Sequence, residues 1–261
     1  MGKILVCPDC HGRNFWKKPC IEHKDEFDKI VFLGDYLSCY PDEWGPGIDY
    51  KRIAIERFKE IIEFKKENPD KVVLLFGNHD GSYFNTEICE CRTDFKNWRE
   101  IHNLFTENIK LFDLAWETKV NDTRYFFSHA GIRKEWLRYI IHGDFLFKWD
   151  DKNVVPPASI FNNVFHVAYD GDGNEEVKGK LESALGVYST YRGWDGASFG
   201  SIVWADIREY LTREYDDVVF ICGHTQLANE PVFLDGAVDL DVRKAFVFDT
   251  ETGEVKEYVA D

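Results

Sequence analysis

The sequence is poor in positive charge. It holds 32 Lys and Arg against 47 Asp and Glu, which gives a formal net charge of −15. Binding along a nucleic-acid backbone requires clustered basic side chains, so this balance excludes broad contact with phosphate backbones. An acidic chain that handles phosphates would need metal ions to offset its own charge.

The sequence also lacks long hydrophobic runs and a cysteine framework. No apolar segment approaches the ~20 residues of a membrane span, and the apolar run at the start is too short for a signal peptide. The seven cysteines are odd in number and scattered, which does not fit a disulfide scaffold. We therefore expect a soluble cytoplasmic protein that makes no membrane contact.

Short apolar runs that stop at glycine or at a metal-binding residue type recur along the chain. They are KILVCPDCHG at the start, KIVFLGD (29–35), KVVLLFGNHD (71–80), RYFFSHAG (124–131) and VVFICGHT (218–225). Such runs predict buried strands whose polar residues lie at the carboxyl ends, where α/β folds gather their ligands.

Helical patterns lie between the predicted strands. Residues 49–70 carry a broad apolar face that ends at Asn68-Pro69, residues 93–109 follow a Thr cap, and residues 133–144 form a shorter pattern. The tail, 230–259, alternates around the turn DTETGE and predicts a terminal antiparallel sheet.

We expect a single domain, 1–261, because 44% hydrophobic composition can bury one large core. Residues 143–200 have weak periodicity and a Pro-Pro break, which indicates a long loop or an insertion that sets substrate specificity.

The strand ends together offer carboxylates, imidazoles and an amide. The residues are Asp9, His11, Asp35, Asn78, His79, His129 and His224. Carboxylate oxygens and neutral imidazoles suit divalent transition metals, and one carboxylate can bridge two ions about 3.5–4 Å apart. The pattern predicts a metal centre at the edge of the sheet.

The order Asp-x-His-Gly, Gly-Asp, Gly-Asn-His-Asp, His-Ala-Gly, Gly-His resembles the calcineurin-like metallophosphoesterases, and within them the phosphoprotein phosphatase branch. The resemblance covers residues 7 to 226. It implies a fold of class α+β or α/β, a two-sheet β-sandwich flanked by helices in four α/β/β/α layers. It also implies a dinuclear metal site.

The resemblance assigns roles to these residues. Asp9 and His11 would ligate the first metal and Asp35 would bridge both, while Asn78, His129 and His224 would complete the second. Two divalent ions, Mn, Fe or Zn, would hold a bridging hydroxide that attacks the phosphorus. His79 would protonate the leaving oxygen, a role that suits a side chain with a near-neutral pKa.

The loop GDYLSCY (34–40) departs from the family pattern. Ser38 stands where the family has an aspartate that orients the general acid, and Asp80 is the candidate to replace it. Cys39 stands where the family has a phosphate-binding arginine. A planar guanidinium binds phosphate bidentately, so Arg192 and Arg13 are the candidates for that role. Gln226 stands at the position of a second histidine in the wider superfamily.

The Cys-x-x-Cys spacing of Cys7 and Cys10 has a second interpretation. A structural zinc site would need Cys89 and Cys91 as well, but their single intervening residue is shorter than zinc sites favour. We expect Cys7 to pack as a small hydrophobe within its strand instead, and Cys10 and Cys39 to be inert neighbours of the site.

These motifs predict a hydrolase of phosphomonoesters whose partner is a phosphorylated small molecule or a Ser/Thr phosphoprotein. SHAGI and GHT also resemble diadenosine tetraphosphatases, so a dinucleoside polyphosphate or cyclic nucleotide is an alternative substrate. A metal-binding scaffold with a degenerate site is the non-enzymatic alternative. The oligomeric state is not encoded in these motifs.

Overall fold

The computed structural model describes residues 2–84, 92–170 and 173–259. The chain divides into two compact units: unit 1 comprises 1–112 and 243–261, and unit 2 comprises 113–242. No helix within the described ranges has both the length and the apolar character needed to cross a membrane. The single domain of 1–261 stays a prediction.

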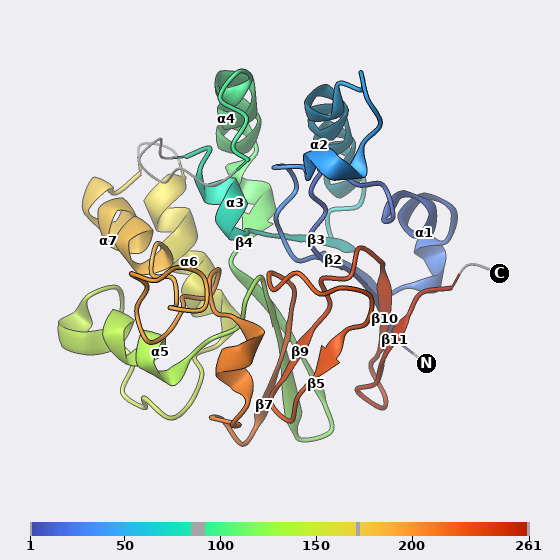
Figure 1. Ribbon diagram of the computed structural model, residues 1–261. Helices are drawn as coiled ribbons and strands as arrows, with labels where there is room; N and C mark the ends of the chain where they lie inside the picture. Colours follow the sequence, from blue (N-terminus) through green and yellow to red (C-terminus); the bar gives the residue numbers. More distant parts are fainter. Residues whose placement is uncertain (1, 85–91, 171–172, 260–261) are drawn as a thin grey trace. The chain divides into compact units, whose positions relative to one another are not determined.

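Unit 1 is built on a mixed sheet with the strand order β11-β10-β1-β2-β3-β4. The central strands β1, β2 and β3 are parallel, and β10 pairs antiparallel with β1. Helices flank this sheet (Figure 1). Its elements are β1 (Lys3–Cys7), α1 (Lys17–Glu22), β2 (Lys29–Phe32), α2 (Tyr50–Glu67), β3 (Val72–Leu75), α3 (Asn78–Gly81), α4 (Trp98–Glu107), β4 (Phe112–Asp113), β10 (Phe246–Asp249) and β11 (Val255–Glu257), with 3₁₀ turns at Lys24–Glu26, Pro41–Glu43 and Ile109–Leu111.

Unit 2 is built on a second mixed sheet with the strand order β5-β6-β7-β9-β8. Strands β6, β7 and β9 are parallel, and β5 and β8 pair antiparallel at the edges. Its elements are β5 (Ala115–Val120), β6 (Thr123–Ser128), α5 (Lys134–Ile141), α6 (Ala158–Tyr169), α7 (Glu175–Leu185), β7 (Val218–Cys222), β8 (Val232–Phe233) and β9 (Ala237–Asp239), with 3₁₀ turns at His142–Asp144 and Ile207–Tyr210.

The predicted fold class is confirmed as α+β, with two mixed sheets flanked by helices. All five predicted buried strands form, as β1, β2, β3, β6 and β7. The long predicted helix is confirmed as α2, which Asp49 caps by accepting a hydrogen bond from the Arg52 amide. Helix α5 confirms the shorter pattern at 133–144.

Three expectations about secondary structure were wrong in part. Helix α4 begins at Trp98 with Asn97 at its N-cap, so Thr93 is not the cap. The tail strands do not form one sheet, because β10 pairs with β1 whereas β9 pairs with β7. Residues 143–200 are not a long loop, because α6 and α7 form there and pack side by side (Figure 1).

An aromatic cluster fills the core of unit 1 beneath the strand ends. The ring centroids of Phe58 and Phe105 lie 4.7 Å apart, and those of Tyr36 and Phe58 lie 5.1 Å apart. Phe112 packs 5.7 Å from Tyr36, and all four rings are buried. Tyr36 also donates a hydrogen bond to the Leu75 carbonyl at 2.8 Å. Because Tyr36 directly follows Asp35, this core fixes the loop after β2.

Removing one ring of this cluster should destabilise unit 1. Phe58 is fully buried on α2, so Phe58→Ala should lower the free energy of unfolding by about 3–5 kcal/mol. Phe95→Ala is the control, because Phe95 is 63% exposed and its loss should cost well under about 1 kcal/mol. Urea denaturation followed by circular dichroism measures both, and equal midpoints would contradict the assignment of Phe58 to the core.

Candidate metal centre

The ends of β1 and β2 are joined through their backbones. Beyond β1, the His11 amide donates to the Asp35 carbonyl at 2.7 Å and the Gly12 amide donates to the Tyr36 carbonyl at 2.9 Å. His11 and Asp35 both have positive φ, 43° and 52°. Such values are uncommon for residues with a Cβ and mark positions that the surrounding structure holds against strain.

The ends of β2 and β3 approach each other closely enough to require glycine. A Cβ on Gly34 would lie 2.6 Å from the Gly77 nitrogen, and a Cβ on Gly77 would lie 2.2 Å from Oδ1 of Asp35. That Oδ1 accepts a hydrogen bond from the His79 amide at 2.9 Å. The Gly-Asp and Gly-Asn-His motifs therefore form one backbone-packed junction.

Asp80 ties the same junction together with its carboxylate. Its Oδ2 accepts from the amides of Asp35 and Gly77, each at 2.9 Å, and its Oδ1 accepts from the Tyr36 amide at 3.2 Å. Burial raises the pKa of Asp80 to about 7, against the opposing effect of these three amide donors. The side chain that was expected to orient His79 thus holds the loop that carries Asp35.

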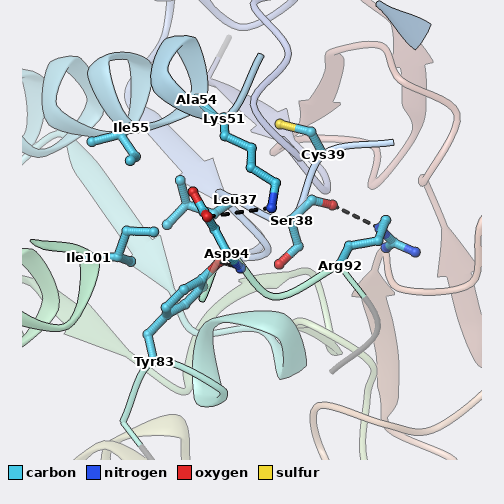
Figure 2. A pocket seen from close by; sticks show the side chains of 10 residues that line it. All are labelled: Leu37, Ser38, Cys39, Lys51, Ala54, Ile55, Tyr83, Arg92, Asp94 and Ile101. Carbon is cyan, nitrogen blue, oxygen red and sulfur yellow. Dashed lines mark hydrogen bonds and ion pairs between the residues drawn. The ribbon is translucent and has the colours of Figure 1, made fainter. Parts of the chain in front are cut away.

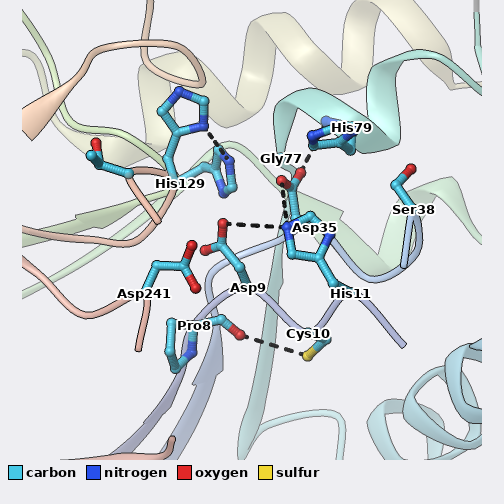
Figure 3. A network of polar contacts seen from close by, with 12 residues as sticks. Pro8, Asp9, Cys10, His11, Asp35, Ser38, Gly77, His79, His129 and Asp241 are labelled. Carbon is cyan, nitrogen blue, oxygen red and sulfur yellow. Dashed lines mark hydrogen bonds and ion pairs between the residues drawn. The ribbon is translucent and has the colours of Figure 1, made fainter. Parts of the chain in front are cut away.

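The His11 ring has the tautomer that a metal ligand needs. Its Nδ1 lies 2.8 Å from the Leu37 carbonyl, so Nδ1 carries the proton and donates it. Its Nε2 then faces Asp35 Oδ2 at 3.6 Å and Asp9 Oδ2 at 4.0 Å, and all three side chains are buried (Figure 3). Burial, together with the nearby His79 and Arg13, holds the pKa of His11 well below its usual range. The neutral ring presents a lone pair beside two buried carboxylates, which fits a divalent cation.

Asn78 and His79 begin α3 and are both buried in unit 1. The His79 ring packs edge-on against the His11 ring, with centroids 5.3 Å apart. Unit 1 therefore brings together Asp9, His11, Asp35, Asn78 and His79.

Unit 2 brings together the other two predicted ligands. His129 follows β6 and His224 follows β7, and Nε2 of His129 lies 3.2 Å from Nδ1 of His224, with both rings buried. His224 has a φ of 71°, and Trp204 packs edge-on against its ring. Two imidazole nitrogens that converge from neighbouring parallel strands are an arrangement suited to binding one ion.

A match along almost the whole sequence shows which family the chain belongs to. The model of the calcineurin-like phosphoesterase family matches residues 2–249. The chain belongs to this family. It is therefore a hydrolase of phosphate esters, in a family that depends on two metal ions. No curated protein matches the chain significantly.

Solved structures of phosphatases share the fold of this phosphoesterase. A cold-active protein-tyrosine phosphatase of a psychrophilic Shewanella species matches with a TM-score of 0.56 and 13% identity, covering 98% of this chain and 80% of that chain. A protein serine/threonine phosphatase from Saccharomyces cerevisiae, with similarity to human phosphatase PP5, matches with a TM-score of 0.51 and 16% identity, covering 100% and 80%. At these identities the likeness shows the fold.

The two arginines predicted to bind phosphate are both held by carboxylates in the phosphoesterase. Arg13 donates to both oxygens of Glu43, at 2.7 and 2.8 Å. Arg192 pairs with Asp206 at 3.2 Å and donates to the His224 carbonyl at 2.8 Å. Their described contacts hold loops in place, and their binding of phosphate stays a prediction.

Cys7 and Cys10 pack as expected. Cys7 and Cys10 are free and buried, and burial raises the pKa of both thiols well above the usual range. A neutral buried thiol is a poor zinc ligand. Cys89 and Cys91, the other half of the considered zinc site, lie outside the described residues. Burial also raises the pKa of Cys39 to about 11, which favours the protonated thiol at neutral pH.

Sequence reasoning missed four residues near these sites. Asp239 and Asp241 are buried at the end of β9, whose partner β7 leads to His224. The run DLDV (239–242) was their signal, but from the sequence it looks superficially like a calcium loop. Tyr40 packs edge-on against His11 at 5.1 Å, and Arg92 contacts His79. No local pattern marks Tyr40 or Arg92.

The close approach of Gly77 to Asp35 allows the metal centre to be tested without replacing a predicted ligand. Gly77→Ala keeps an allowed backbone, with φ −105° and ψ 174°, but its Cβ must displace the Asp35 carboxylate. We expect the variant to retain less metal after dialysis, measured by plasma mass spectrometry. Gly81→Ala is the control, because its Cβ would meet only Phe76 at 3.9 Å. Wild-type metal content in Gly77→Ala would contradict the role of this junction.

Proposed function

We propose that the protein hydrolyses phosphomonoesters with two divalent metal ions, Mn, Fe or Zn. Asp9 and His11 would hold the first ion, Asp35 would contribute a ligand to both, and Asn78, His129 and His224 would hold the second. The observation that carries this proposal is the neutral His11 ring, whose Nε2 faces the buried carboxylates of Asp9 and Asp35 while Nδ1 donates to Leu37.

Charge supports this assignment. Two buried carboxylates close to each other cost free energy unless cations offset them. Two divalent ions bring four positive charges against the two of Asp9 and Asp35, so the loaded site is cationic within an acidic protein. When bound, such ions act as Lewis acids toward a phosphoryl oxygen and lower the pKa of water from ~15.7 to about 7.

The residues of this chain then have separate tasks. Asp80 holds the loop that carries Asp35, and Asp35 accepts from the His79 amide, which fixes the start of α3. His79 donates a proton to the ester oxygen as the bond between phosphorus and that oxygen breaks. A water molecule supplies the new oxygen on phosphorus, so the products are an alcohol and inorganic phosphate.

The substrate that we favour is a phosphomonoester on a small molecule or on a Ser/Thr side chain of a protein. The shared fold of two phosphatases supports this choice only at the level of architecture. A panel of aryl phosphates, phosphopeptides, dinucleoside polyphosphates and cyclic nucleotides separates this substrate class from the alternatives. Binding of two metal equivalents without turnover on any of these esters would favour the scaffold.

The proposed general acid predicts a selective loss of turnover. With manganese bound, His79→Ala should hydrolyse an aryl phosphate about 10² to 10⁴ times more slowly, because protonation of the leaving oxygen is lost. Its metal content should stay at the wild-type level. His142→Ala, a change at an exposed histidine of unit 2, is the control and should leave the rate unaltered. An unaffected rate in His79→Ala would remove it from the mechanism.

The proposed bridging ligand predicts loss of metal together with activity. Asp35→Asn keeps an oxygen that can accept from the His79 amide but removes the negative charge. The variant should therefore fold yet bind fewer metal ions, and its activity should fall with its metal content. Asp42→Asn, at an exposed aspartate of the same unit, is the control. Full metal content in Asp35→Asn would refute the ligand assignment.

A further inference from the structure

Arg92 places a guanidinium beside the proposed general acid. Its Nη2 lies 3.1 Å from Nε2 of His79. Its Nε donates to the Ser38 carbonyl at 2.9 Å (Figure 2). The centre of the guanidinium lies 3.9 Å from the centroid of the Tyr40 ring. A cation at this distance from an aromatic face is attracted to it.

The segment that carries Arg92 is anchored on its C-terminal side. The Asp94 amide donates to the Tyr83 hydroxyl at 3.1 Å, and its carboxylate pairs with Lys51 at 3.4 Å (Figure 2). Thr93 and Asp94 are both buried. Arg92 itself has a φ of 79°, which is strained for any residue with a Cβ. Strained backbone that its surroundings hold in place is typical of functional sites.

The loop after β2 supplies both contacts that position this guanidinium. Ser38 and Tyr40 flank Cys39, which occupies the position where an arginine was expected from the sequence. Arg92, which lies more than 50 residues further along the chain, donates a hydrogen bond to the Ser38 carbonyl and places its guanidinium over the Tyr40 ring. A positive charge therefore lies next to this loop, although the loop itself lacks an arginine.

The contact with His79 defines what Arg92 can do. A guanidinium only donates, so Nε2 of His79 is the acceptor and the neutral ring carries its proton on Nδ1. Charged phosphate oxygens are stronger acceptors for a guanidinium than a neutral ring nitrogen. An ester oxygen that lies close enough to Nε2 to be protonated from it must also lie within reach of Arg92.

We propose that Arg92 binds the phosphate group of the substrate beside His79. This inference rests on the proposed function, because it adds a substrate contact to the same site. In the free protein the guanidinium donates to Nε2 of His79. When a phosphate binds, Arg92 donates to its oxygens instead, so that Nε2 becomes available to take up a proton from solvent and to pass it to the leaving oxygen. Arg92 is then a catalytic residue, and Ser38 and Tyr40 position it.

The test compares Arg92→Ala and Arg92→Lys with Arg99→Ala, which removes the same charge from an exposed position on α4. Arg92→Ala should lower kcat/KM for an aryl phosphate by about 10²-fold, the usual loss for one preorganised donor. Arg92→Lys keeps the charge without the planar fork and should show a smaller loss. Arg99→Ala should stay within about twofold of wild type.

Two further readouts separate phosphate binding from a structural role. Product inhibition by inorganic phosphate should weaken in Arg92→Ala by about the same factor as kcat/KM, while metal content and the urea midpoint stay unchanged. Added guanidinium ion should restore part of the activity of Arg92→Ala and none in His79→Ala. If Arg92→Ala does not fold, the inhibition constant of inorganic phosphate is measured for Arg92→Lys instead. A weaker inhibition than in wild type supports phosphate binding by Arg92, and an unchanged inhibition contradicts it.

The outcomes distinguish this inference from the function on which it rests. Hydrolysis by wild type together with unchanged kcat/KM and phosphate inhibition in the Arg92 variants overturns the role of Arg92 and leaves the function intact. If wild type hydrolyses no ester, the proposed function fails, and calorimetry of inorganic phosphate with the metal-loaded protein decides instead. Weaker phosphate binding in Arg92→Ala than in Arg99→Ala then supports the inference, whereas equal binding or no binding overturns it.

Discussion

The carboxylate of Asp80 joins the loop after β2 to the loop after β3 by hydrogen bonds. The geometry of unit 1 depends on these hydrogen bonds. The carboxylate accepts them from the amides of Asp35, Tyr36 and Gly77. The acceptor reaches both loops only because Gly34 and Gly77 allow their backbones to approach without a Cβ between them. A buried carboxylate that satisfies three amides costs less than one left alone, since each donor replaces a lost water.

The aromatic core and the strained loops act together. Tyr36 packs against Phe58 and Phe112 and donates to the Leu75 carbonyl, so the residue after Asp35 cannot shift without opening the core. This rigidity maintains the positive φ of His11 and Asp35, which would otherwise relax. Side chains that must meet an ion at a set distance benefit from such a support, because a loose ligand binds more weakly.

The sequence predicted best those features that local chemistry determines. Strands that end at Gly-Asp, Gly-Asn-His or His-Ala-Gly were recognisable because each motif needs close backbone packing or a ligand at that point. Helices α6 and α7 were missed because Pro156-Pro157 and the Gly-Asp run are typical of loops and interrupt the helical pattern. These short helices are stabilised by packing against each other, which the local sequence does not reveal. The pairing of β10 with β1 was also missed, because only tertiary structure selects a strand partner so distant in sequence.

Arg92 illustrates why the remaining part of a site escapes prediction. Sequence reasoning searched for a replacement arginine by motif. It selected Arg13, which follows the predicted ligand His11, and Arg192, which lies beside a glycine-rich stretch. Both have carboxylate partners that the motif does not reveal, Glu43 and Asp206. The position of Arg92 depends on a carbonyl, a ring face and the anchored Asp94, none of which has a sequence signature. A guanidinium can reach a site from any neighbouring segment, so the loss of an arginine from one motif does not show that the site lacks one.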